Sequence, residues 1–236
     1  MFCVYARKKY KTMQLIQQLR KHRRLEFTLL LMASCFLSFG LIVLRVMATG
    51  KLHFIFLIWN LFLAFIPFFI ANWLYLFKDR FNKLSVIPVV AMWLLFFPNA
   101  PYIITDIIHL QPDKSFGYWY NLLIVISCVW NALVMGLLSL NDIQNVVAEK
   151  FGKKTAWILS VSSVFLGAFG IYIGRILRWN SWDIFFDTKC LMYDIGEHVT
   201  NPSAHGRTFG ITLFYGTFLL VVYLFFRQLM VRKESV

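Results

Sequence analysis

The chain has 236 residues, of which 59% are hydrophobic and only 15% charged, and its mean hydropathy is +0.65. A soluble domain is about half apolar and about a quarter charged, so this composition excludes an ordinary soluble fold. The net charge of +13 does not indicate nucleic-acid binding, because the basic residues fall in the segments between long apolar runs.

Six apolar runs follow one another, and each is long enough to cross a bilayer as a helix, which takes about 20 residues. We therefore predict an all-α integral membrane bundle of six transmembrane helices. The expected spans are 27–47, 53–77, 85–104, 119–140, 155–177 and 209–226. Together they form a membrane domain over 27–226, which includes an outer loop at 178–208. A basic segment precedes it at 1–26 and a tail follows at 227–236.

The basic residues are divided unequally between the two sides of this bundle. The segments 1–26, 78–84, 141–154 and 227–236 hold 17 of the 24 Lys and Arg residues, and the other flanks hold seven. Lys and Arg accumulate on the cytoplasmic side of membrane proteins. This predicts a multi-pass protein of a cell membrane with both termini in the cytoplasm, its basic N-terminal segment lying against anionic lipid.

Two spans carry stripes that predict how they pack. Small residues share one face of the fifth span, and Gly167, Gly170 and Gly174 on this face predict close approach of another helix, in this chain or in a second copy. In the fourth span Asn121 and Asn131 lie on one face with a cysteine and an aspartate, which predicts that this face points into the bundle. The full sets are Ala156, Ser160, Ser163, Gly167, Gly170, Gly174 and Asn121, Cys128, Asn131, Asp142.

The outer end of the third span contains Pro98 and Pro101, three residues apart, which predicts that the helix breaks or bends sharply there. Asn99 lies between them and can hydrogen-bond the freed backbone groups. Asp106 and His109 follow at a spacing that places both on one face of a helical turn.

The fifth span ends on the same side with Arg175 and Arg178, followed by Asn180 and Asp183. We expect a polar pocket open to this side, walled by spans three, four and five. In it Arg175 and Arg178 bind an anionic group, because a guanidinium makes paired hydrogen bonds to phosphate and carboxylate. Asn99, Asn180 and Asp183 would complete substrate binding in that pocket.

The stretches FPNAPYIITDIIHL (97–110) and GRILRWNSWD (174–183) resemble the two signature segments of an uncharacterised bacterial membrane protein family, domain of unknown function 1361. The likeness runs from about the second span to the start of the outer loop. The resemblance implies a multispan protein of a bacterial cytoplasmic membrane, and it implies no activity.

Four interpretations of the polar residues remain open. In an enzyme, Asp106 and His109 act as catalytic base and acid on an anionic lipid or lipid-linked substrate. In a metal site, both residues and Asp183 hold a divalent ion, although no motif identifies a metal or a cofactor. In a transporter, the broken helix lines a binding site for a small molecule. In an accessory or structural subunit, the carboxylates and arginines form an ion-pair network between helix ends.

Overall fold

The computed structural model of the chain describes residues 24–110, 117–179, 183–201 and 206–234. Two compact units divide the chain between Leu52 and His53. The first unit contributes one unbroken helix, α2 (Arg24–Thr49), whose 26 residues are long and apolar enough to cross a membrane. All the later helices belong to the second unit, which contains every residue predicted for the site.

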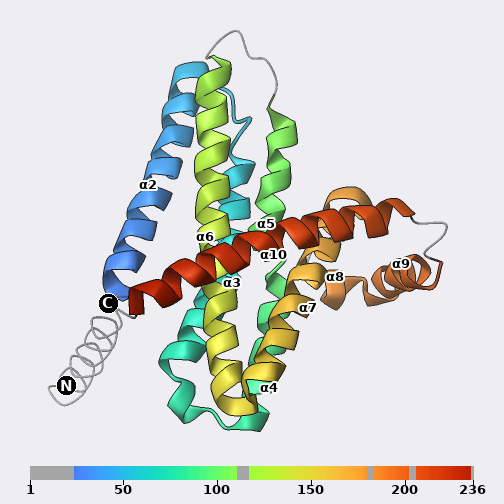
Figure 1. The fold of residues 1–236 in the computed structure, drawn as a ribbon. Coiled ribbons are helices and arrows are strands. Elements are labelled where there is room, and N and C mark those ends of the chain that lie inside the picture. The colour runs from blue at the N-terminus through green and yellow to red at the C-terminus, as the bar shows by residue number, and fades with distance from the viewer. Residues whose placement is uncertain (1–23, 111–116, 180–182, 202–205, 235–236) are drawn as a thin grey trace, which may run out of the picture. The chain divides into compact units, whose positions relative to one another are not determined.

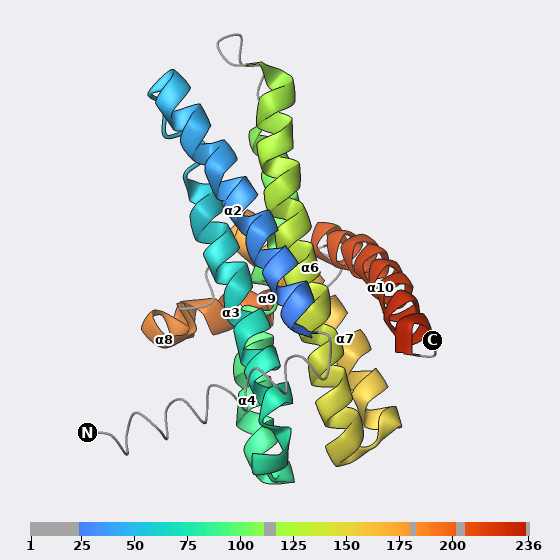
Figure 2. The ribbon, with the colours of Figure 1, turned by 90° about the vertical axis from the view of Figure 1, so that its left-hand side faces the viewer.

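The second unit is built on two helical hairpins and a final oblique helix. In the first hairpin, α3 and α4 are joined through the short helix η1, and in the second, α6 and α7 are joined at Gly152. Both turns lie at the same end of the unit, which we call the turn end (Figure 2). Helix α10 runs obliquely across α7 and α6 (Figure 1). The bounds are α3 (Phe56–Leu76), η1 (Lys78–Arg80), α4 (Lys83–Phe96), α6 (Tyr118–Phe151), α7 (Lys153–Tyr172) and α10 (Gly206–Glu234).

Six helical segments among the described residues are long and apolar enough to span a membrane, which confirms the predicted six-span all-α protein. The third segment, Lys83–His109, is composite. Helix α4 stops at Phe96, a single turn α5 (Asn99–Tyr102) follows, and a 3-10 helix η2 (Ile103–His109) completes the segment. The predicted break at Pro98 is therefore confirmed, and the segment continues five residues past the expected end at 104.

Helix α6 continues past the expected end of the fourth span at 140, as far as Phe151. Residues 141–151 contain no proline or glycine, and Ile143, Val146 and Val147 keep the helical spacing and are buried. The helix ends only at Gly152. Its φ of +96° is a backbone conformation that glycine adopts without strain because it has no side chain.

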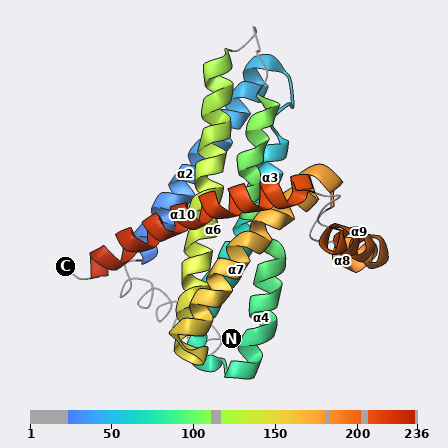
Figure 3. The ribbon, with the colours of Figure 1, turned by 45° about the vertical axis from the view of Figure 1, so that its right-hand side comes forward.

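Helical structure also fills parts of the chain expected to lie outside the spans. The outer loop 178–208 contains α8 (Asp183–Phe186) and α9 (Thr188–Thr200), which lie beyond the C-terminal end of α7 (Figure 3). Helix α10 continues to Glu234, past the expected end of the sixth span at 226. The predicted N-terminal segment 1–26 falls almost wholly outside the described residues.

Two packing features bring the ends of spans three and five together. The polar stripe of α6 is buried, as predicted, with Asn131 fully enclosed. The small-residue face of α7 lies against the broken segment 97–102 of the same chain. A Cβ atom added at Gly170 would lie 2.7 Å from Pro98 Cβ, and one at Gly174 would lie 3.2 Å from Tyr102 Cε2. Glycine thus permits the close approach on which the site depends.

Candidate functional site

The third span reaches the site as a 3-10 helix rather than an α-helix. Pro98 and Pro101 have no backbone N–H, so the regular hydrogen-bonding pattern of α4 cannot continue through them. In η2 one turn takes three residues, which places Asp106 and His109 one above the other. The side chains of these two residues therefore face the same neighbour.

That neighbour is the end of the fifth span, which also departs from α-helical geometry. Residues Ile173–Leu177 form a π-helical turn, η3, a form that is rare and frequent at functional sites. Arg178 ends it in the left-handed region with φ +63°, and the Trp179 N–H donates to the Ile173 carbonyl over 3.3 Å. Such a closure normally uses glycine, so a side chain at this position carries backbone strain.

Arg175 in η3 is the centre of the polar contacts. Its Nε donates to Thr105 Oγ1 over 2.8 Å and its Nη2 donates to Asp106 Oδ1 over 2.5 Å. Its Nη1 donates to His109 Nε2 over 3.2 Å, so this ring nitrogen is the acceptor. The guanidinium also lies over the Tyr102 ring, with Cζ 4.8 Å from the ring centroid. Each guanidinium nitrogen thus has a partner within the chain.

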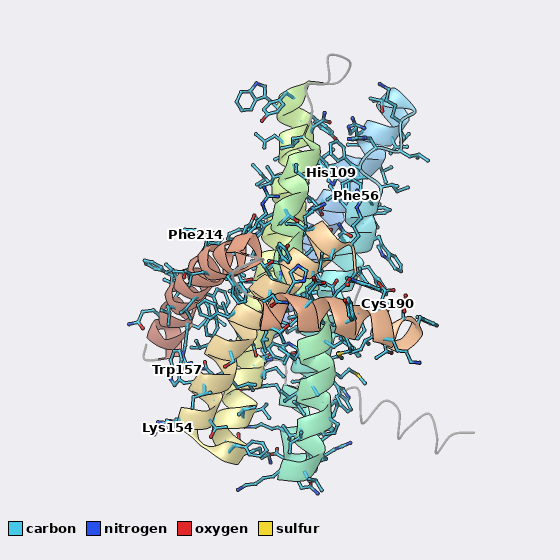
Figure 4. All side chains as sticks on the ribbon, turned by 90° about the vertical axis from the view of Figure 1, so that its right-hand side faces the viewer. Phe56, His109, Lys154, Trp157, Cys190 and Phe214 are labelled. Atoms are coloured by element: carbon cyan, nitrogen blue, oxygen red, sulfur yellow. The ribbon has the colours of Figure 1, made fainter. Side chains whose placement is uncertain are left out.

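Asp106 is held from a second side by the second span. Its Oδ2 accepts a hydrogen bond of 2.7 Å from Asn60 Nδ2 in α3, and only 1% of Asp106 is exposed. His109 packs its ring edge-on against Phe56, 5.1 Å between centroids, at the start of the same helix (Figure 4). We call Asn60, Tyr102, Thr105, Asp106, His109 and Arg175 the Arg175 cluster.

The cluster is formed by a different set of helices from the one expected for the pocket. It draws on spans two, three and five, because Asn60 of α3 takes the place expected for a residue of span four. The signal for Asn60 was present in the sequence as an amide within a strongly apolar span, where polar groups usually find a partner. Nothing in the sequence pointed to Thr105 or Tyr102 as partners of Arg175.

The other predicted site residues lie apart from these contacts. The Asn99 amide donates to the Phe96 carbonyl over 2.9 Å and so stabilises the break after α4. Arg178 is exposed at the C-terminal end of the η3 turn. Asp183 begins α8, where its carbonyl accepts from the Asp187 N–H. Asn180 lies outside the described residues.

Helix α9 is fastened to the end of span five close to the cluster. Trp179 Nε1 donates to Asp194 Oδ2 over 2.8 Å. The ring of His198, which is buried, lies 5.6 Å from the Tyr172 ring, and its Nδ1 donates to the Asp194 carbonyl over 2.8 Å. These contacts fix α9 relative to the residues just before and just after Arg175.

The described part of the chain contains no group of three or more His, Cys, Asp or Glu side chains placed to hold a metal ion. Between Asp106 and His109, the two residues expected as ligands, Arg175 bridges both side chains. A cavity of about 20 Å³ is lined by apolar residues, among them Phe97, Leu133 of α6 and Leu219 of α10, and includes no residue of the cluster.

All residues of the Arg175 cluster fall within the part of the chain that matches a protein-family model, residues 59–222. The model is described as a protein of unknown function, DUF1361. No curated protein and no solved structure matches the chain. Since the match covers well over half of the sequence, including both signature stretches, the chain belongs to the DUF1361 family.

Proposed function

We propose that the protein is a non-enzymatic, multi-pass membrane component in which the Arg175 cluster is an ion-pair network that locks the ends of spans two, three and five together. The supporting observation is that the hydrogen-bonding groups of the central ion pair, Asp106 and Arg175, are occupied by partners within the protein. Both carboxylate oxygens of Asp106 and all three guanidinium nitrogens of Arg175 have partners inside the chain.

The same geometry argues against an acid–base role for the predicted catalytic residues. A catalytic base needs a lone pair directed at the proton of a substrate. Asp106 is buried and directs one oxygen to Arg175 and the other to Asn60. His109 directs Nε2 to Arg175 and packs its ring against Phe56. The favoured role is therefore charge compensation within the membrane-spanning segment.

One observation favours a second candidate, the binding of an anionic lipid or lipid-linked substrate by the same cluster. A guanidinium carries five N–H groups, and 23% of the Arg175 side chain is exposed. In this case the protein partners orient Arg175 and the remaining N–H groups contact a phosphate, with the exposed Arg178 close in sequence.

We further propose that the Arg175 cluster faces the extracytoplasmic side of a bacterial cytoplasmic membrane and that the turn end faces the cytoplasm. The distribution of Lys and Arg supports this orientation. Cys190, exposed on α9, is then labelled by a membrane-impermeant maleimide added to intact cells. Labelling of Cys190 only after lysis would reverse the orientation.

A double-mutant cycle tests the ion-pair function. Asp106→Asn and Arg175→Gln each leave one buried charge without its partner, which costs roughly 3–5 kcal/mol of folding free energy. The double variant should lose less than the sum of the two, because no charge is left unpaired. Thermal unfolding in detergent, with Arg178→Gln as the exposed control, measures these differences.

The competing outcome separates the two candidates. If Arg175→Gln unfolds at the wild-type temperature but no longer retains a defined anionic lipid in native mass spectrometry, the cluster is a binding site. Two single variants with additive and small effects on the melting temperature would likewise refute the ion-pair function.

A further inference from the structure

A second arginine lies over an aromatic ring near the turn end. Arg227 of α10 places Cζ 4.4 Å from the centroid of the Trp157 ring in α7. Its Nη1 is buried, yet it has no hydrogen-bond partner among the residues that the structure describes. An unpaired donor on a charged group is costly, so this nitrogen indicates that a hydrogen-bond acceptor beyond the described residues completes the site.

The surroundings of this pair favour an anion. Lys154 is exposed three residues before Trp157 and so shares its face of α7. Figure 4 shows both side chains on the side of α7 where α10 ends. Helix α7 begins at Gly152 without a side-chain cap, so the partial positive charge of its N-terminus is not offset by a capping oxygen.

Three acidic residues lie toward the turn end: the exposed Asp79 of η1, Glu149 and Asp142. Glu149 pairs with Lys78 across the two hairpin turns. Asp142 is buried inside the bundle, near the Tyr223 hydroxyl, which itself donates to Gln144 Oε1 over 2.6 Å. Lys154 is exposed, so its positive charge faces the surroundings of the bundle on the face of α7 that carries Trp157.

We propose that Arg227, Lys154 and the Trp157 ring bind the phosphate of an anionic phospholipid. Arginine matches phosphate geometry through its fork of N–H donors, and a phosphate oxygen supplies the acceptor that Nη1 lacks. Arg227 lies in the last turns of a candidate span that ends at Met230, and tryptophan favours the membrane–water interface. Lipid headgroups occupy this depth. The site shares no residue with the Arg175 cluster, so a result that refutes one proposal leaves the other unaffected.

Native mass spectrometry of the full-length protein tests this site, with phosphatidylglycerol as the anionic probe and phosphatidylcholine as the zwitterionic one. Wild-type protein should retain phosphatidylglycerol in preference. Arg227→Gln should weaken that binding about tenfold, the effect of losing one charge-assisted contact. Arg207→Gln is the matched control, because it removes the same charge from an exposed position near the start of the same helix.

Trp157→Leu and Lys154→Gln provide the second line of evidence, since Lys154 is exposed and its replacement leaves the fold intact. Both should lower phosphatidylglycerol retention while the melting temperature stays unchanged. Displacement of the bound lipid by millimolar inorganic phosphate would identify a soluble phosphate as the ligand instead and overturn the lipid assignment. Equal retention by Arg227→Gln and Arg207→Gln, or equal retention of both lipids by the wild type, would also overturn it.

Discussion

Two arginines of this protein lie over aromatic rings at opposite ends of the same unit, and they differ in what surrounds them. Arg175 stacks on Tyr102 and directs all of its nitrogens to partners, one of them the carboxylate of Asp106. Arg227 stacks on Trp157 at a similar distance, but its buried Nη1 lacks a partner among the described residues. The stacking is common to both, so the completeness of the hydrogen bonding distinguishes a structural arginine from one available to a ligand.

The difference has an energetic consequence. Removing one partner of a buried ion pair leaves the other charge uncompensated in a medium that solvates it poorly. Asp106, only 1% exposed, is such a partner for Arg175. Arg227 is half-buried at the end of a helix, where water or lipid can replace what a substitution removes. The two arginines should therefore respond differently to the same change.

The largest expected effect is the difference in unfolding free energy between variants of the two arginines. Arg175→Gln should lower the free energy of unfolding by roughly 3–5 kcal/mol, whereas Arg227→Gln should change it by less than about 1 kcal/mol. Denaturation of the two variants in the same detergent measures the gap. Equal losses would show that both arginines are structural and would remove the distinction drawn between the two ends.

A smaller effect separates two close helix contacts that depend on glycine, one at Gly170 of α7 and one at Gly216 of α10. A Cβ atom at Gly170 meets the ring of Pro98, which is part of the backbone, at 2.7 Å. A Cβ atom at Gly216 of α10 meets the Phe165 ring even more closely, but that ring belongs to a half-buried side chain that can turn aside. We expect Gly170→Ala to cost about 1–3 kcal/mol and Gly216→Ala less, despite its shorter contact.

Thermal unfolding of the two variants checks this order. Gly210→Ala is the control, because a Cβ atom there meets nothing within 4 Å. A greater loss for Gly216→Ala would mean that α10 packs as rigidly as the segment beneath the Arg175 cluster.

The smallest effect concerns the ion pair of the turn end. Lys78 and Glu149 side chains remain 30% and 43% exposed, so the pair should contribute less than about 1 kcal/mol and weaken with salt. The hydrogen bond with Glu149 raises the pKa of Lys78. The pair therefore contributes its full stabilisation below the ordinary lysine pKa of about 10.4. That stabilisation is lost only as the pH rises through the raised pKa of Lys78.

Comparing Lys78→Met with the wild type at low and at high NaCl measures that contribution. The difference in unfolding free energy should shrink with salt at pH 7 and stay constant between pH 7 and 10. A difference as large as that of Arg175→Gln would show that exposure does not distinguish the two pairs.

Sequence alone predicted the six spans and the break at Pro98 because both depend on local chemistry: runs of apolar residues and missing backbone donors. It also placed Asp106, His109 and Arg175 at one depth on one side. It did not predict which of them touch. Arg175 and Asp106 are 69 residues apart in sequence, and their contact depends on how the two helices are rotated about their axes. The π-helical turn and the 3-10 helix set that rotation, and neither has a clear sequence signature.

The errors have physical reasons as well. Residues 141–151 were placed outside the fourth span with the basic flank 141–154, although their apolar residues keep helical spacing. Asn60 was not assigned to the site, because its partner Asp106 lies 46 residues away in sequence. Hydropathy indicates which segments lie in the membrane, but it does not indicate which side chains of different helices are in contact.

Helix α6 has 34 residues, and at a rise of about 1.5 Å per residue it is about 51 Å long. The hydrocarbon core of a bilayer is about 30 Å thick, so roughly 20 Å of this helix stands clear of it. The polar part of α6, from Asp142 to the turn at Gly152, accounts for most of that overhang. A tilted α6, or one whose turn-end residues lie in the headgroup region, accommodates this length while its backbone hydrogen bonds stay intact. We expect the length of this helix to let the protein fit membranes of different thickness.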